Sequence, residues 1–98
     1  MLTVFASFRL PLESVAEARP LMIPVIEGTQ AEPGCQSYTL AEDVAEPGLF
    51  RVAEVWDSRE ALTAHFETAH MKLWIEQRTQ LGFYDRQVSL YEAAATEL

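Results

Sequence analysis

Hydrophobic and polar residues recur with clear periods along most of the chain. Residues 2–9 are rich in β-branched and aromatic side chains and stop at Pro11, which predicts a strand. From residue 15 to residue 29 the apolar positions recur with the period of a helix. Because Pro20 and Pro24 each lack a backbone donor, we expect this helix to be kinked or in two pieces.

The segment Glu32-Pro33-Gly34 predicts the turn that ends this helix. Two strand-like segments follow at residues 35–42 and 49–57, and the loop between them holds Pro47-Gly48. A short loop of this kind favours a hairpin, so we expect these two strands to pair antiparallel.

The last third of the chain predicts a helix in two pieces and a final strand. Asp57-Ser58 resembles a helix N-cap, with Glu60 completing a capping-box pattern. The first piece runs to about residue 68, and a second piece at 70–81 precedes Gly82, a C-cap residue. A strand at 83–92 follows.

The predicted order is β-α-β-β-α-β, the ferredoxin-like split arrangement of the α+β class with a four-stranded antiparallel sheet. A length of 98 residues fits one domain, 1–98. Strand 49–57 is largely apolar on both faces, and helices cover only one face of such a sheet. We therefore expect a homodimer that buries the face with Arg51, Ala53 and Val55. A sheet that leaves a few aliphatic side chains exposed is the alternative.

Composition narrows the classes of partner. The chain has seven basic and fifteen acidic residues and a net charge of −8, which disfavours nucleic acid and anionic membrane surfaces. Its longest apolar run, Leu21 to Ile26, is too short to span a bilayer. The single cysteine, Cys35, has no internal disulfide partner, which favours a reducing, cytoplasmic compartment.

Glu54 and His65 are the first candidates for chemistry. Glu54 shares a strand face with Phe50, Val52 and Trp56, so its carboxylate enters apolar surroundings and needs a partner. His65 lies on the inward stripe of the next helix, and we expect the two side chains to form a hydrogen bond. Such a pair orients an imidazole as a general base. The same pair is also an ordinary way to satisfy a buried histidine.

His70 points away from His65 on an unbroken helix, but a break at Thr68-Ala69 would return it to the same pocket. Neither arrangement has the spacing of a helical zinc site, so we expect no metal. No glycine-rich phosphate loop or nucleophile elbow supports a cofactor. Aromatic residues predict the walls of an apolar pocket, or else belong to the core. These are Trp56, Tyr38, Phe66 and Trp74.

The ordered set of motifs resembles the antibiotic biosynthesis monooxygenase family. It begins with residues 31–35 (AEPGC) and Tyr38, continues through residues 50–58 and 60–62, and ends with His65 and His70. The resemblance covers about residues 2–92. It implies a dimeric α+β barrel with a pocket in each subunit, and it makes Glu54, His65 and His70 the polar pocket candidates, with Trp56 as a wall.

Family members include oxygenases of anthrone- and quinol-type substrates that use no metal or flavin. The resemblance thus implies a cofactor-independent monooxygenase that joins dioxygen to a small hydroxylated aromatic or quinol, with His65 as the base. An isomerase of a small polar metabolite and a non-catalytic binding or dimerisation module are the alternatives. Haem-degrading relatives usually carry an Asn on the first strand, whereas this chain has no Asn and has Ser7 there.

Overall fold

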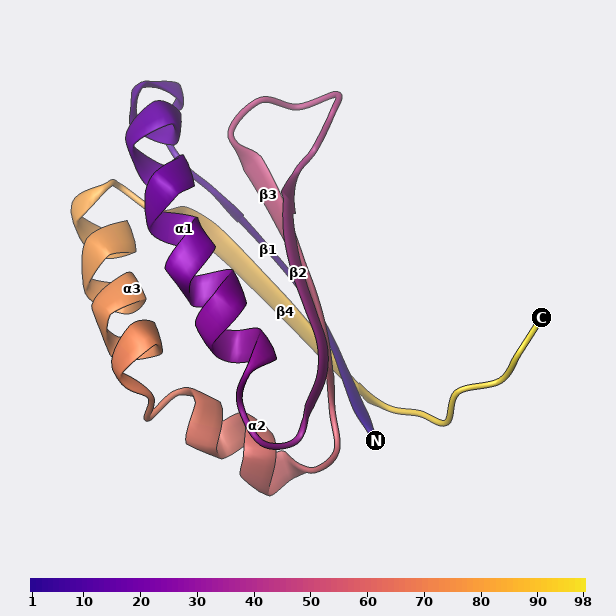
Figure 1. The fold of residues 1–98 in the computed structure, drawn as a ribbon. Helices are drawn as coiled ribbons and strands as arrows, with labels where there is room; N and C mark the ends of the chain where they lie inside the picture. The colour runs from indigo at the N-terminus through magenta and orange to yellow at the C-terminus, as the bar shows by residue number, and fades with distance from the viewer.

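The computed structural model describes residues 1–98, and its elements follow the predicted order (Figure 1). A single turn of 3₁₀ helix, η1, precedes the first α-helix, and the predicted two-piece helix is present as α2 and α3. The elements are β1 (Leu2–Arg9), η1 (Leu12–Ser14), α1 (Val15–Gln30), β2 (Cys35–Glu42), β3 (Leu49–Trp56), α2 (Arg59–His65), α3 (Ala69–Gln80) and β4 (Tyr84–Glu92).

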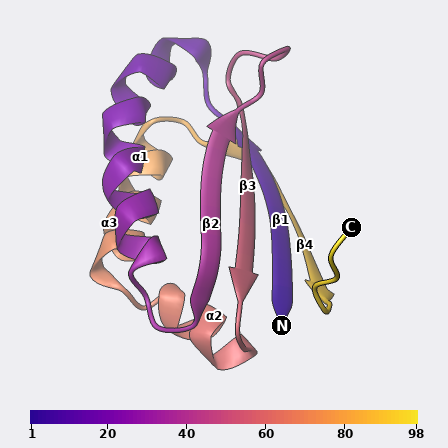
Figure 2. The same cartoon turned by 45° about the vertical axis from the view of Figure 1, so that its right-hand side comes forward.

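The four strands form one antiparallel sheet in the order β2-β3-β1-β4. This confirms the predicted α+β, ferredoxin-like class. The three α-helices lie on one side of the sheet, as Figure 2 shows. Register places Val4 opposite Glu54 on β3 and opposite Leu90 on β4. Directly opposed residues share a face, so these three side chains all point toward the helices.

The core lies between the helices and β1, β2 and β3. Its main cluster joins Phe8 and Phe50, which stack with ring centroids 5.3 Å apart, to Met22 of α1 and Trp74 of α3. The buried positions of α1 recur at three- and four-residue intervals, as the predicted stripe requires. This core fixes α1 and α3 over the sheet and thereby positions the segments at their ends.

Of the two predicted alternatives for α1, a kinked helix or a helix in two pieces, the second is wrong. The helix continues from Val15 to Gln30 with Pro20 and Pro24 inside it. The two prolines are four residues apart and therefore share a face of the helix, and both side chains are exposed. Water can reach the backbone carbonyls that lack an amide partner on this face, so the helix tolerates the lost donors.

The helix after β3 begins one residue later than the predicted cap. Ser58, and not Asp57, is the N-cap, and its hydroxyl accepts from the Ala61 amide at 3.2 Å. Asp57 instead accepts a hydrogen bond from Gln36 at 2.7 Å. The expected break is present, but the first piece is shorter than predicted, because α2 ends at His65 and not near residue 68. Helix α3 begins at Ala69.

The other face of the sheet has no helix on it. Phe5 and Tyr91 stand on this face, contact each other edge to face at 6.2 Å, and are each 54% exposed. Strand β4 is exposed along its whole length. None of the helices has the length and apolar character needed to cross a membrane.

Candidate functional site

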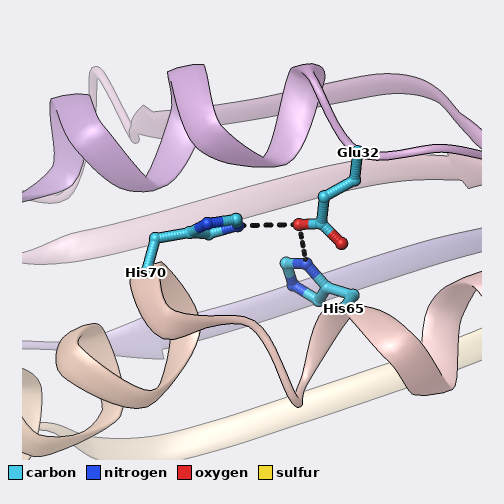
Figure 3. Close-up of side chains that lie close together, drawn as sticks. All are labelled: Glu32, His65 and His70. Carbon is cyan, nitrogen blue, oxygen red and sulfur yellow. Dashed lines mark hydrogen bonds and ion pairs between the residues drawn. The ribbon is translucent and has the colours of Figure 1, made fainter.

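Two histidines and a glutamate meet where α1, α2 and α3 approach one another (Figure 3). One oxygen of Glu32, Oε2, lies 2.7 Å from Nδ1 of His65 and 2.7 Å from Nε2 of His70. Glu32 follows the end of α1, His65 is the last residue of α2, and His70 is in the first turn of α3. The side chains of Glu32 and His65 are buried, whereas that of His70 is partly exposed.

The break between α2 and α3 brings the two histidines together. Thr68 is the N-cap of α3, where its hydroxyl accepts from the Met71 amide at 3.4 Å. The same hydroxyl donates to the carbonyl of His65 at 2.6 Å, which ties the two helices together. His70 then packs against Gly28 of α1, where an added Cβ would lie 2.8 Å from its Nδ1. The position of His70 therefore depends on a glycine at residue 28.

The shared carboxylate fixes which ring nitrogens carry protons. An ionised carboxylate only accepts hydrogen bonds, so Nδ1 of His65 and Nε2 of His70 are the donors. When His65 is neutral, its Nε2 therefore carries the lone pair. That nitrogen forms no hydrogen bond within the chain. It is also not fully buried, because Thr29 Oγ1 is the one fully buried side-chain polar atom that lacks a partner. His65 thus offers an oriented, unpaired base.

The predicted hydrogen bond between Glu54 and His65 is wrong. Oε1 of Glu54 instead accepts from Nε1 of Trp56 at 2.9 Å, because side chains two residues apart on a strand share a face. Burial raises the pKa of Glu54, and the Trp56 donor and the nearby His65 oppose this shift. The carboxylate that orients His65 is Glu32.

A small cavity of about 40 Å³ lies between the sheet and helices α2 and α3. Five of the predicted site residues line it, namely Glu54, His65, Tyr38, Phe66 and Trp74. A second cavity of about 160 Å³ adjoins it, and its lining includes the apolar side chains Val88 and Leu90 of β4. The two share Ala6, Glu54, Phe66 and Arg86. Together they form a mostly apolar space beside one oriented base.

Two predicted site residues do not line this cavity. Trp56 is fully buried behind the base, with its ring centroid 5.0 Å from that of His65. His70 contacts Glu32 and the ring of His65, whose centroid lies 6.2 Å from its own. Tyr38 does line the cavity, and its hydroxyl stays protonated because burial and the charge of Glu54 raise its pKa.

The cluster also contains a donor set that divalent metals accept. The ligand atoms of Glu32, His65 and His70 all lie within 4.8 Å of one another, and two imidazoles with one carboxylate suit zinc or iron. Each nitrogen-oxygen distance of 2.7 Å is also that of a charge-assisted hydrogen bond. Protons alone therefore account for the geometry, and the expectation of no metal stays a prediction.

Sequence reasoning missed three residues of the site. The sequence pattern places Glu32 only in a turn, although its Glu-Pro-Gly segment is among the motifs that resemble the family. Arg78 of α3 and Arg86 of β4 also line the small cavity. No periodicity marks these arginines, because residues on different elements meet only after the sheet and helices have packed.

Comparisons with known proteins agree with this fold. Residues 1–77 match the family model described as antibiotic biosynthesis monooxygenase. An uncharacterized protein of Synechocystis is 36% identical over 72 residues, which are 74% of this chain, and the chain spans about half the length of that curated relative.

Solved structures extend the likeness to the whole chain. A protein of Deinococcus radiodurans, provisionally named an antibiotic biosynthesis monooxygenase, is 26% identical with a TM-score of 0.91, covering 100% of this chain and 97% of its own. A crystal structure named an antibiotic biosynthesis monooxygenase is 31% identical with a TM-score of 0.89, covering 97% and 100%. A Mycobacterium tuberculosis protein is 27% identical with a TM-score of 0.85, covering 97% and 96%.

Proposed function

The chain belongs to the antibiotic biosynthesis monooxygenase family, and we propose that it is a cofactor-independent monooxygenase of a small hydroxylated aromatic or quinol, with His65 as general base. The family supports a monooxygenase-like activity in general. The observation that carries the finer proposal is the unpaired Nε2 of His65, on a ring that lines the cavity and is held at Nδ1 by Glu32.

The reaction begins when His65 Nε2 takes a proton from the substrate hydroxyl. The resulting anion transfers one electron to dioxygen, and the two radicals combine into a carbon-bound peroxide. Protonated His65 returns its proton to the peroxide, the O–O bond breaks, and the C–H at that carbon is lost. One oxygen atom remains as a new carbonyl and the other leaves as water, so substrate and dioxygen balance without an added reductant.

The neighbouring residues assist His65 in separate ways. Glu32 holds the tautomer with the lone pair on Nε2 and stabilises the imidazolium once it forms, as the carboxylate of a catalytic triad does. His70 donates to the same oxygen and so tempers the basicity that Glu32 confers. Phe66, Trp74 and Tyr38 form walls that keep bulk water from the substrate anion.

We expect purified protein to consume oxygen with at least one quinol or anthrone, and to do so equally with a chelator present. The measurement is oxygen uptake over a substrate panel, with metal content determined on the same sample. Loss of activity with chelator and its return with added zinc or iron would contradict the proposal and make Glu32, His65 and His70 a metal centre.

One observation favours a second function. The cavity presents three donors besides His65, namely Arg78, Arg86 and the Tyr38 hydroxyl, and convergent donors of this kind suit an isomerase of a small polar metabolite. Such an enzyme would use the same base and need no oxygen. Substrate turnover under strictly anaerobic conditions would identify it, and a protein that turns over no substrate in either condition would be a binding module.

We further propose that the working form is a homodimer joined through the helix-free face of the sheet. Ala53 and Val55 lie at the centre of this face, and Phe5, which pairs with Ala53, stands exposed beside them. Because the helices cover only the opposite face of the sheet, these apolar side chains contact water unless a second copy of the chain covers them. A stable interface of this kind buries more than about 2,000 Å² in total.

The dimer predicts a specific effect of a buried charge. We expect sedimentation at micromolar concentration to give a dimer for the native protein and a monomer for Ala53→Glu, because a carboxylate would be placed in the apolar interface. Ala64→Glu, on the exposed side of α2, is the matched control and should remain dimeric. A monomeric native protein would refute the interface.

A further inference from the structure

The basic residues of this acidic chain divide into those that form ion pairs and those that form none. Of the seven, four form ion pairs with carboxylates, namely Arg9, Arg19, Arg51 and Lys72. Three form none, and two of these three, Arg78 and Arg86, line the cavity beside His65. In a chain with fifteen acidic residues, two cations without an ion-pair partner in one small cavity require an explanation.

The two guanidinium groups also affect each other. Burial and the charge of Arg86 both lower the pKa of Arg78. The fold therefore keeps the two cations near each other although they repel each other and Arg78 loses hydration. Arg78 is fixed in place by the ring of Phe83, which lies 4.3 Å from its guanidinium carbon. Arg86 reaches the same cavity from β4, across the sheet edge that no helix covers.

No other group that lines the cavity forms an ion pair with either arginine. Glu54 is the only acidic residue that lines it, and one of its oxygens already accepts from Trp56. Burial raises the pKa of the Glu54 carboxyl, and the Trp56 donor and the positive charges of His65 and Arg86 oppose this shift. The Tyr38 hydroxyl is neutral because burial raises its pKa. The five N–H donors of each guanidinium are therefore available to a ligand from outside the chain.

We propose that Arg78 and Arg86 form an anion-binding subsite of the His65 cavity, and that the substrate carries a carboxylate or a similar oxyanion besides the group that His65 deprotonates. This rests on the proposed function only in treating the ligand as a substrate. Planar guanidinium groups recognise carboxylates through paired hydrogen bonds, which gives orientation as well as affinity. The anionic group binds the arginines, and the adjoining apolar space takes the hydrocarbon part.

The test uses two probes that differ in charge. 4-Hydroxybenzoate is ionised at neutral pH, whereas 4-hydroxybenzamide has nearly the same shape and is neutral. Calorimetry or NMR titration at low salt measures both dissociation constants for the native protein, Arg78→Gln, Arg86→Gln and Arg59→Gln. Arg59 is the third unpaired cation and lies outside the cavity at the start of α2, so its variant is the matched control.

We expect native protein and Arg59→Gln to bind the benzoate at least about tenfold more tightly than the amide, and each cavity variant to reduce this preference to about twofold or less. Arg78→Lys, which keeps the charge, should retain part of it and checks for loss of packing against Phe83. Equal affinities in the native protein, no binding of either probe, or a preference that survives in both cavity variants would overturn the subsite.

Binding and turnover separate this inference from the proposed function. If the benzoate is preferred through the arginines but no oxygen is consumed with any substrate, the subsite stands and the monooxygenase proposal fails. If neutral quinols are oxidised and no probe distinguishes the arginine variants, the monooxygenase proposal stands and the subsite fails.

Discussion

Replacing His65 with alanine is expected to lower the rate of oxygen uptake by about 10²–10⁴-fold, the usual contribution of a general base. His65 offers an unpaired Nε2 on a ring that lines the cavity, whereas His70 does not line it and contacts only Glu32 and the ring of His65 there. His70→Ala should therefore have the smaller effect. The measurement is kcat for oxygen uptake with the best substrate of the quinol and anthrone panel.

The His65 comparison needs a control for folding, because this side chain is only 1% exposed. His65→Gln keeps a donor that can reach Glu32 but provides no base, so it should fold like the native protein and remain inactive. Circular dichroism and thermal melting check the fold of each variant. Activity in His65→Ala, or a larger loss of activity in His70→Ala than in His65→Ala, would exclude His65 as the base.

Replacing Glu32 with glutamine is expected to lower kcat by at least about 10²-fold, although Glu32 does not line the cavity. The amide can accept one hydrogen bond through its oxygen, but it does not stabilise an imidazolium, and its NH₂ group favours the wrong tautomer of His65. The measurement is kcat for oxygen uptake, compared with the native protein.

Glu54→Gln is the matched control for Glu32→Gln, since both remove one buried carboxylate near His65. The Glu54 carboxyl accepts from Trp56, a bond that the glutamine oxygen can also accept, so we expect a smaller change in kcat. Equal kcat values for native protein and Glu32→Gln would show that Glu32 has only a structural role. A larger loss in Glu54→Gln would return the orienting role to Glu54.

Local sequence patterns were sufficient for the order and type of the elements. The apolar strand pattern of residues 49–57 and the helical stripe from residue 15 are local patterns, and the ferredoxin-like order follows from them. The same reasoning was wrong in allowing a break at the two prolines of α1. A missing donor is costly only where the freed carbonyl is buried, and the sequence does not state which face of the helix meets water.

The sequence by itself determined that His65 lies on an inward helical position. It also determined that the carboxylate of Glu54, on the apolar face of its strand, needs a partner. Only the tertiary structure decided the pairs: Glu54 with Trp56, and Glu32 with both histidines. Glu32 is 33 residues from His65, and it meets that side chain because the end of α1 packs against the break between α2 and α3. Periodicity records which face a residue occupies, but contacts between elements depend on how whole helices pack on the sheet.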